Sequence, residues 1–299
     1  MSAPLALLML LARECDWAGV YVLCSGEHLL GGVFCVFNAC VRFFMEYLSD
    51  PWLVAAMLGA GVLAGFINTL AGGGGLLILP LLMLSGMSAA LANGTMRVAV
   101  LIQSAEAVRQ FNKRGSMPFA DLPAILVPSL LGTLVGALAA AFLPETILKP
   151  VLLITLVVVA LLMVLRPSQM SPDPNSVPLS PNTSLSGWIG LFFAGAYGGF
   201  VQAGVGFVLL AVLAGQLRYD LLRSNALKLA ITGSFTILAL AIFVARGQVA
   251  WLPGLVVAAG SLIGVRLGVS FAHAVSPRVL KRILLVMVLA VCLAAAIKG

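Results

Sequence analysis

Apolar stretches of helix length, separated by short polar breaks, make up most of the sequence. After residue 50 they lie at 52–68, 75–86, 92–111, 119–143, 147–165, 187–202, 205–217, 224–245, 251–272 and 279–297. About 20 apolar residues let a helix cross the hydrocarbon of a membrane. The alternating apolar pattern of barrel strands is absent from the sequence. Because lipid offers no partner to an open strand, the pattern predicts an all-α, polytopic transmembrane helix bundle.

The stretches are arranged as an internal repeat. Residues 65–68 (GFIN) match residues 199–202 (GFVQ), and after two residues are skipped in the first copy the later landmarks share one offset (225 − 93 = 132). Because the matches fall on glycine, asparagine and aromatic positions, they indicate a duplication. The pairs are Ala71-Gly72 with Ala203-Gly204, Asn93 with Asn225, Gly115 with Gly247, Phe119 with Trp251, Gly132 with Gly264, Gly136 with Gly268 and Leu148 with Leu280.

Each copy holds five apolar segments, and the second segment of each is too short for a comfortable span. An odd number makes the second copy enter the membrane from the opposite face. We therefore expect two inverted five-segment repeats with broken helices at the repeat motifs. With the 112–118 loop inside, nine basic residues lie inside and three outside, as the positive-inside rule requires. The inside residues are Arg109, Lys113, Arg114, Arg166, Arg218, Arg223, Arg278, Lys281 and Arg282, and the outside ones Lys149, Arg246 and Lys298.

The chain divides into four parts. Residues 51–166 are the predicted first membrane repeat and 186–299 the second, joined by a polar cytoplasmic linker, 167–185, that is rich in Pro, Ser and Asn. Residues 1–50 form an N-terminal extension outside the repeat. Three interpretations of it stay open: a signal peptide, an extra membrane element, or a mis-called start in which Met45 is the true initiator and 1–44 are not translated.

Composition favours lipid as the main solvent of this chain. Hydrophobic residues make up 62% and charged residues 9%, whereas a soluble domain carries about 25% charged residues. The net charge of +7 indicates membrane orientation rather than nucleic-acid binding, because no basic run with interleaved aromatics occurs. The five cysteines lack paired-ligand spacing and only two histidines occur, so we expect neither a metal site nor a cofactor.

Glycine-rich breaks interrupt both copies, at residues 69–75 (TLAGGGG) and 203–206 (AGVG). Non-helical backbone persists at membrane depth only where it lines a cavity or is buried in protein. Glycines before a helix start present N–H donors and the positive end of the helix dipole, which favour anions. We therefore predict a central substrate site where the two breaks meet. Close helix packing by small residues is the alternative.

Polar side chains accompany both breaks, and such residues inside a span usually face a cavity or a partner. Arg97 lies one position from the repeat partner of Lys228 (228 − 132 = 96), so each copy sends one cation to nearly the same level. Two alternatives stay open: the cations snorkel to the interface, and Asn93 and Asn225 are helix N-caps. The predicted substrate-binding residues are Asn68, Thr69, Gly72, Gly73, Gly74, Gly75, Asn93, Arg97, Gln202, Gly204, Gly206, Asn225 and Lys228.

Glu106 lies on the same segment as Arg97, three residues before Arg109. It is either a proton-coupling carboxylate or an ion-pair partner of Arg109. No catalytic residue is predicted, because the sequence contains no nucleophile elbow, HExxH, Walker motif or paired carboxylates. We expect a protein that is not an enzyme. The alternative is a membrane-embedded enzyme or assembly factor in sulfur or lipid metabolism, with Glu106 as its only acid within a span.

The motifs resemble those of the TauE/SafE family of sulfite and organosulfur exporters. The resemblance is carried by GFINTLAGGGGLLILPLLMLSG at 65–86, by GGFVQAGVGF at 198–207 with its SNALK continuation, and by the duplicated architecture over about residues 52–298. It implies a multi-pass permease of the bacterial inner membrane that moves sulfite, sulfonates or related sulfur oxyanions by proton-linked or potential-driven exchange. The 50-residue extension departs from the family pattern, which favours Met45 as the initiator.

Together the residues and the resemblance predict an integral membrane transporter for small anions that works by alternating access. The expected partners are a small anionic substrate, the lipid bilayer and protons as the coupling ion, with no nucleic acid. The sequence carries no indication of oligomeric state.

Overall fold

The helices follow the predicted apolar segments closely. The computed structural model describes residues 51–70, 72–165, 179 and 184–274. The expected extension at 1–50, most of the linker, and the 279–297 segment with its basic cluster therefore lie outside the described residues. Within the described ranges all regular structure is helical, as predicted. The elements are α3 (Pro51–Leu70), α4 (Gly75–Leu84), α5 (Ala89–Lys113), η3 (Phe119–Asp121), α6 (Leu122–Phe142), α7 (Glu145–Leu165), α8 (Leu185–Phe200), α9 (Val205–Leu210), the π-helical η5 (Ala211–Gln216), α10 (Leu221–Ala245) and α11 (Trp251–Ala274).

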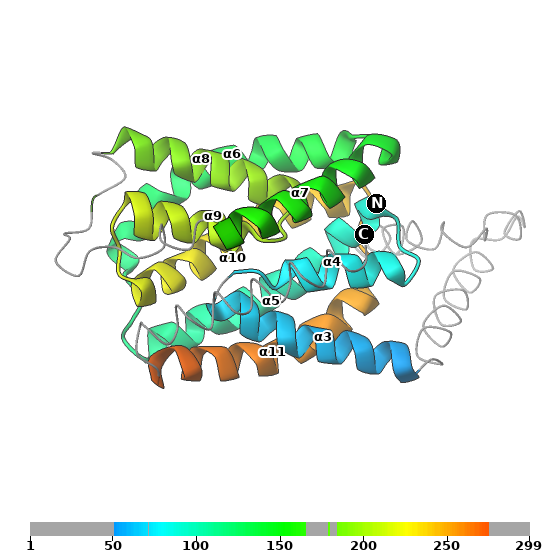
Figure 1. The fold of residues 1–299 in the computed structure, drawn as a ribbon, viewed down its shortest axis with the longest axis horizontal. Helices are drawn as coiled ribbons and strands as arrows, with labels where there is room; N and C mark the ends of the chain where they lie inside the picture. The colour runs from blue at the N-terminus through cyan, green and yellow to red at the C-terminus, as the bar shows by residue number, and fades with distance from the viewer. Residues whose placement is uncertain (1–50, 71, 166–178, 180–183, 275–299) are drawn as a thin grey trace, which may run out of the picture.

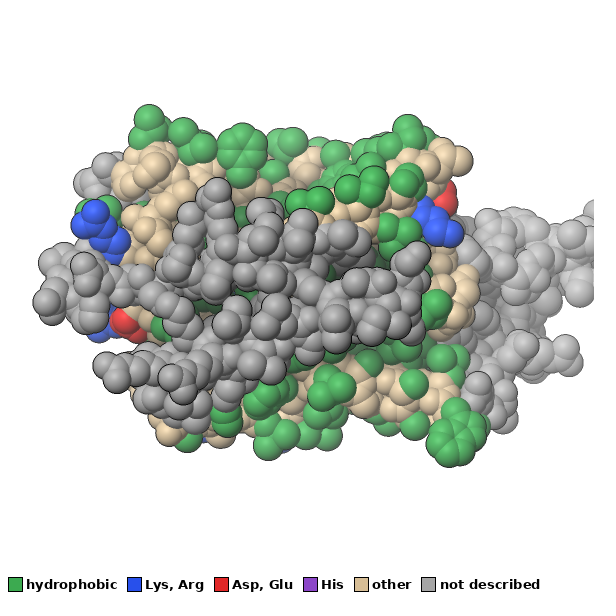
Figure 2. Space-filling view, in the orientation of Figure 1, with side chains coloured by type: hydrophobic (Ala, Val, Ile, Leu, Met, Phe, Trp, Pro, Cys, Tyr) green, Lys and Arg blue, Asp and Glu red, His purple; other side chains and the backbone are tan. Residues whose placement is uncertain are grey.

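The surface is that of a multi-pass membrane protein. Four helical stretches of the described chain are long and apolar enough to cross a membrane: α3, η3 with α6, α10 and α11. Large apolar side chains such as Leu63, Val127 and Ile263 are more than half exposed on them. Figure 2 shows hydrophobic side chains along both flanks, with charged side chains at the two ends of the long axis. Such flanks are stable against lipid rather than water.

The helices pair across the predicted boundary between the repeats. α3 packs along α11 and α8 packs along α6, while α5 contacts both α10 and α11. In Figure 1 these two outer pairs lie on opposite sides of the bundle, with α5 and α10 between them. The first helix of each predicted repeat therefore takes its main packing partner from the other repeat.

Glycines allow the backbones of each outer pair to approach closely. A Cβ added at Gly65 of α3 would lie 2.3 Å from the carbonyl oxygen of Ser261, and one at Gly264 of α11 would lie 2.0 Å from that of Val62. Small residues at four-residue spacing are a usual way for membrane helices to pack tightly. The α6–α8 pair has the same arrangement, formed by Gly132, Gly136, Gly195 and Gly199.

Backbone landmarks recur at the offset found in the sequence. Positive φ angles occur at Gly72, Gly86 and Gly115, and again 132 positions later at residues 204, 218 and 247. Ser88 caps α5 and Asp220 caps α10, each through its side chain, again at that offset (220 − 88 = 132). Asn93 and Asn225 consequently lie inside helices, and the alternative that they are N-caps is wrong. The domain bounds 51–166 and 186–299 stay predictions.

Each break separates a long helix from a short one that turns back beside it. α4 follows α3 after a four-residue interruption, and α9 with η5 follows α8. A Cβ at Gly74, the N-cap of α4, would lie 2.3 Å from the carbonyl oxygen of Ala64 and 2.9 Å from Cβ of Asn68. The start of α4 is thus packed on the last turns of α3. The broken helices predicted at the repeat motifs are present in the structure.

Candidate functional site

The two glycine breaks touch each other in the middle of the bundle. A Cβ added at Gly72 would lie 2.3 Å from Cα of Gly206, and one added at Gly206 would lie 2.2 Å from Cα of Gly72. A Cβ at Gly75 would likewise lie 2.8 Å from Cα of Ala203. These residues are all buried. Only glycine permits this contact at Gly72, because its φ of +89° is also unfavourable for other residues.

Two backbone donors at the breaks have no acceptor among the described residues. They are the N–H groups of Gly204 and Gly206. Neighbouring N–H groups do bond within the turns, as Leu76 does to Gly73 and Phe207 to Gly204. The breaks therefore combine buried, unpaired main-chain donors with helix N-termini, an arrangement that suits an anion.

Arg97 on α5 reaches across to the end of α8 in the other half. Its guanidinium donates to the carbonyl oxygens of Gly198 (3.2 Å) and Gly199 (2.5 Å) and to Oε1 of Gln202 (2.8 Å). The group also lies over the ring of Phe243, 4.5 Å from its centroid, which adds a cation–π contact. The side chain is fully buried, so the alternative that Arg97 snorkels to the interface is wrong.

Lys228 on α10 makes the equivalent contact in the opposite direction. Its Nζ donates to the carbonyl oxygens of Asn68 (2.9 Å) and Thr69 (3.3 Å), which end α3, and to Oδ1 of Asn225 (2.8 Å). Only 1% of the residue is exposed, so the snorkelling alternative is wrong here as well. Each half thus places a cation against the carboxyl end of the other half's broken helix, where the helix dipole favours positive charge.

Neither cation has a carboxylate partner among the described residues. The ion pairs of the described chain involve Glu106 and Asp220 only, and Arg97 and Lys228 take part in none of them. Their acceptors are carbonyl and amide oxygens, which are neutral groups. Arg97 and Lys228 therefore lie among neutral acceptors, and an anion bound beside them would favour the charged form of both side chains.

The remaining predicted polar residues also gather at the breaks. Gln202 has φ +65° and uses both ends of its amide, because Nε2 donates to Oγ1 of Thr236 at 2.8 Å. Asn93 donates through Nδ2 to the carbonyl oxygen of Phe200 (2.8 Å). Oδ1 of Asn93 and Nδ2 of Asn225 have no partner among the described residues. The structure thus brings the predicted site residues of both copies to one place, including Thr69, whose hydroxyl bonds its own helix at Gly65.

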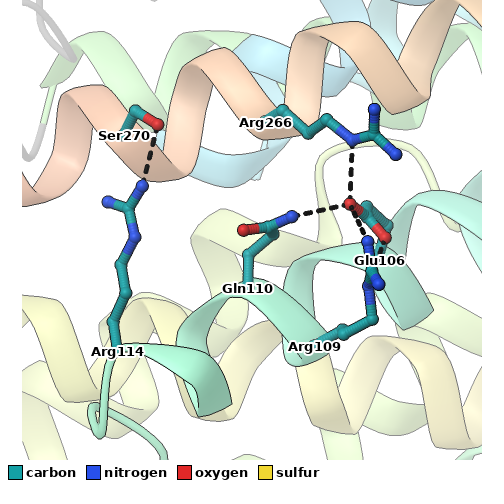
Figure 3. A network of polar contacts seen from close by, with 6 residues as sticks. All are labelled: Glu106, Arg109, Gln110, Arg114, Arg266 and Ser270. Atoms are coloured by element: carbon teal, nitrogen blue, oxygen red, sulfur yellow. Dashed lines mark hydrogen bonds and ion pairs between the residues drawn. The ribbon is translucent and has the colours of Figure 1, made fainter.

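Glu106 lies outside this group, near the end of α5. Its carboxylate pairs with Arg109 and, across the helix interface, with Arg266 of α11, each at 2.9 Å, and accepts from Gln110 at 2.8 Å (Figure 3). The ion pair with Arg109 that the sequence left as one alternative is present. The partner from α11 was not expected. A coupling role for Glu106 stays a prediction.

Sequence reasoning missed several residues of the centre. Thr236 and Phe243 contact Gln202 and Arg97, and Gln103 and Ser104 are fully buried. A polar residue within an apolar span was the available signal for Thr236, Gln103 and Ser104. No group of three His, Cys, Asp or Glu side chains that could hold a metal ion occurs within the described ranges.

Broken helices, a lipid-facing surface and a polar centre define a helical membrane protein of the transporter class. The profile of the family described as "Sulfite exporter TauE/SafE" matches residues 57–295, and the chain belongs to this family of membrane transporters.

Curated relatives carry transporter names. The chain is 27% identical over 246 residues to "Probable membrane transporter protein ORF9" of Sinorhizobium sp., covering 81% of this chain and 91% of the relative. It is 28% identical over 216 residues to a "Probable membrane transporter protein" of Haemophilus influenzae, covering 72% and 84%. It is 27% identical over 223 residues to "Probable membrane transporter protein YfcA" of Escherichia coli, covering 74% and 81%. No solved structure matches the chain.

Proposed function

We propose that this protein moves small sulfur oxyanions, sulfite or sulfonates, across the bacterial inner membrane by alternating access. The observation that carries the proposal is the contact between the two breaks beside two buried cations with no carboxylate partner. The description of the family profile names sulfite export, which supports a sulfur oxyanion as the substrate. Taurine-like, sulfoacetate-like and inorganic members of this class share an oxyanion head.

The oxyanion binds where main-chain donors and positive charge converge. The N–H groups of Gly73 to Gly75 and of Gly204 and Gly206 hold its oxygens, and Asn68, Asn93 and Asn225 orient it. Arg97 and Lys228 act mainly through their field, because the terminal nitrogens of both side chains already donate to the helix ends. Unpaired donors make such a site selective, since a neutral solute would leave the positive charge uncompensated.

The two halves are inverted repeats, and the course of the chain in Figure 1 supports this part of the proposal. α3 begins at the right end of the bundle, whereas α8, its counterpart, begins at the left end; α11 finishes at the left, whereas α6 finishes at the right. α3 packs with α11, and α6 packs with α8. During alternating access each of these two pairs moves as a rigid body past the other, while the central site stays in place. All thirteen predicted site residues are buried in this conformation, as an occluded state requires.

Flux into proteoliposomes tests the proposal. Labelled sulfite, a sulfonate and thiosulfate are presented to the full chain, and we expect flux above empty liposomes for at least one of them. Arg97→Gln should reduce that flux by more than about tenfold, the value of a charge-assisted interaction of about 1.5 kcal/mol. Arg246→Gln is the matched control, because Arg246 is a cation at a helix end that lies over Phe142. Absence of flux for every anion would overturn the proposal.

Coupling to protons is tested separately through Glu106. If this carboxylate couples transport, Glu106→Gln should retain substrate exchange while the dependence of net flux on a pH gradient disappears. If its role is only to join α5 to α11 through Arg266, the pH dependence stays and only thermal stability falls. Exchange and net flux measured on the same liposomes separate these outcomes.

A further inference from the structure

A pair of neighbouring residues in the middle of α5 is buried without hydrogen-bond partners. Gln103 and Ser104 are both 0% exposed. Among the described residues, no partner exists for Oε1 or Nε2 of Gln103 or for Oγ of Ser104. A buried amide or hydroxyl left without a partner costs about 1–3 kcal/mol, so these groups need an explanation.

The other buried hydroxyls of the bundle behave differently. A serine or threonine inside a helix usually bonds the carbonyl four residues earlier. Ser129 does so to Ile125 at 2.9 Å, and Thr133 does so to Ser129 at 2.8 Å. Ser104 makes no such bond within its own helix. Because no described residue bonds this hydroxyl, it can bond a group from outside the protein.

The pair lies beside the second break. Ser104 faces Gly233 of α10, since a Cβ added there would lie 3.2 Å from Cβ of Ser104. One turn further along α10, Thr236 accepts from Gln202, whose Oε1 in turn accepts from Arg97. Gly233, which Ser104 faces, is thus about one helical turn along α10 from Thr236, while Gln103 and Ser104 lie about two turns beyond Arg97 along α5.

The internal repeat shows that this feature belongs to one half only. At the 132 offset, Ser104 corresponds to Thr236, which is engaged with Gln202, and Gln103 corresponds to Phe235 (235 − 103 = 132). Phe235 is an apolar side chain packed near Gly198. At these two positions the first half therefore has uncharged polar side chains without described partners, whereas the second half has a hydrogen-bonded threonine and a packed phenylalanine.

We propose that Gln103 and Ser104 form an uncharged subsite that binds the tail of the substrate, while the glycine breaks bind its oxyanion head. This inference rests on the proposed function. Gln103 offers an acceptor as well as a donor, and a bare oxyanion has only acceptors at its surface. The occupant that satisfies the subsite is therefore an organic oxyanion with a hydroxyl or amine on a short carbon chain.

Binding of two matched sulfonates to the purified full chain tests the subsite. 2-Hydroxyethanesulfonate carries the hydroxyl, and ethanesulfonate lacks it. We expect the hydroxyl to tighten binding by about tenfold or more, because a site with unpaired polar groups rejects the analogue that leaves them unpaired. Gln103→Leu and Ser104→Ala should reduce this ratio to within about twofold while the affinity for ethanesulfonate is kept.

Ser129→Ala is the control, because Ser129 is equally buried but bonds its own helix; its ratio should remain that of the unmodified chain. Equal affinity for the two sulfonates, or a ratio unchanged in Gln103→Leu and Ser104→Ala, overturns the subsite and leaves the proposed transport intact. Failure of both sulfonates and of sulfite to bind overturns the proposed function together with it.

Discussion

Charged side chains have different kinds of partner at the centre of the bundle and at its ends. At the centre Arg97 and Lys228 are buried, each bonded to two backbone carbonyls and one side-chain amide of neutral residues. At the end of α5 and α11, Glu106 instead pairs with two arginines that are more than half exposed. The centre surrounds its cationic side chains with neutral partners, whereas the end pairs its arginines with a carboxylate.

The two halves are also alike at the centre, and they differ at the position of Glu106. Both halves send a cation to the other half's broken helix. At the ends, the position equivalent to Glu106 is Leu238 (106 + 132 = 238), so the ion pairs of Glu106 have no counterpart there. Arg114 and Arg246 match at the same offset, and both reach from a helix end to the next outer helix, Arg114 to Ser270 of α11 and Arg246 over Phe142 of α6. Shared chemistry at the centre indicates a requirement on both copies, whereas the Glu106 network serves one end of the bundle only.

The largest effect is expected at the contact between the breaks. Gly72→Ala adds a Cβ against Gly206 at a φ of +89°, which should cost roughly 2–5 kcal/mol from backbone strain and overlap together. Thermal unfolding of the purified protein measures the loss, and anion flux should disappear with it. Gly86→Ala is the control, because its φ is +96° but nothing lies within 4 Å, so only about 1–2 kcal/mol of strain applies. Equal losses would show that the contact between breaks contributes nothing.

The next effect tests whether the two cations are equivalent. Lys228→Met and Arg97→Met should each reduce anion flux by more than about tenfold, since each removes a charge-assisted interaction of about 1.5 kcal/mol or more. The two losses should agree within about threefold. Arg246→Met, which removes a cation from a helix end, should keep flux near that of the unmodified chain. A large loss in one central variant alone would break the equivalence of the halves.

A smaller effect is expected where the outer pairs pack. Gly65→Ala places a Cβ 2.3 Å from the carbonyl oxygen of Ser261 and should lower stability by about 1–3 kcal/mol, because α3 and α11 must separate. Gly59 lies on the same helix with nothing within 4 Å. Gly59→Ala should raise stability by up to about 1 kcal/mol through helix propensity. The sign of the change therefore separates packing from propensity, and two changes of the same sign would contradict the close contact.

The smallest effect is expected at the end network. Arg266→Leu removes one partner of Glu106, but the arginine is 60% exposed, so stability should fall by no more than about 1 kcal/mol. A double-mutant cycle with Glu106→Gln, read by thermal unfolding, isolates the pair. A loss comparable to that of Gly72→Ala would remove the contrast between centre and end.

Much of the fold follows from the order of apolar and polar residues. The helices coincide with the predicted segments, and the breaks at residues 71–74 and 201–204 fall at the glycine motifs. These breaks could be predicted from the sequence because glycine is the residue that a helix interior tolerates least after proline. The same register located Arg97 and Lys228 at one level.

Helix pairing and the targets of the cations could not be obtained in this way. A periodic apolar pattern does not specify which helices pack against each other. The packing of α3 and α8 on helices of the other half was therefore not expected. Arg97 and Lys228 donate to backbone carbonyls. Because every residue has such a carbonyl, the sequence does not indicate which ones are the acceptors. The contact of Arg266 with Glu106 was not expected either, because the distance between two helices is a property of the tertiary fold.

The exchanged packing of α3 on α11 has a consequence for biogenesis. α3 leaves the ribosome long before α11 has been synthesised, so it enters the bilayer with its glycine face directed at lipid or at an assisting protein. Neither half is then a complete folding unit, and co-expression of the halves as separate chains should yield stable protein only when both are present.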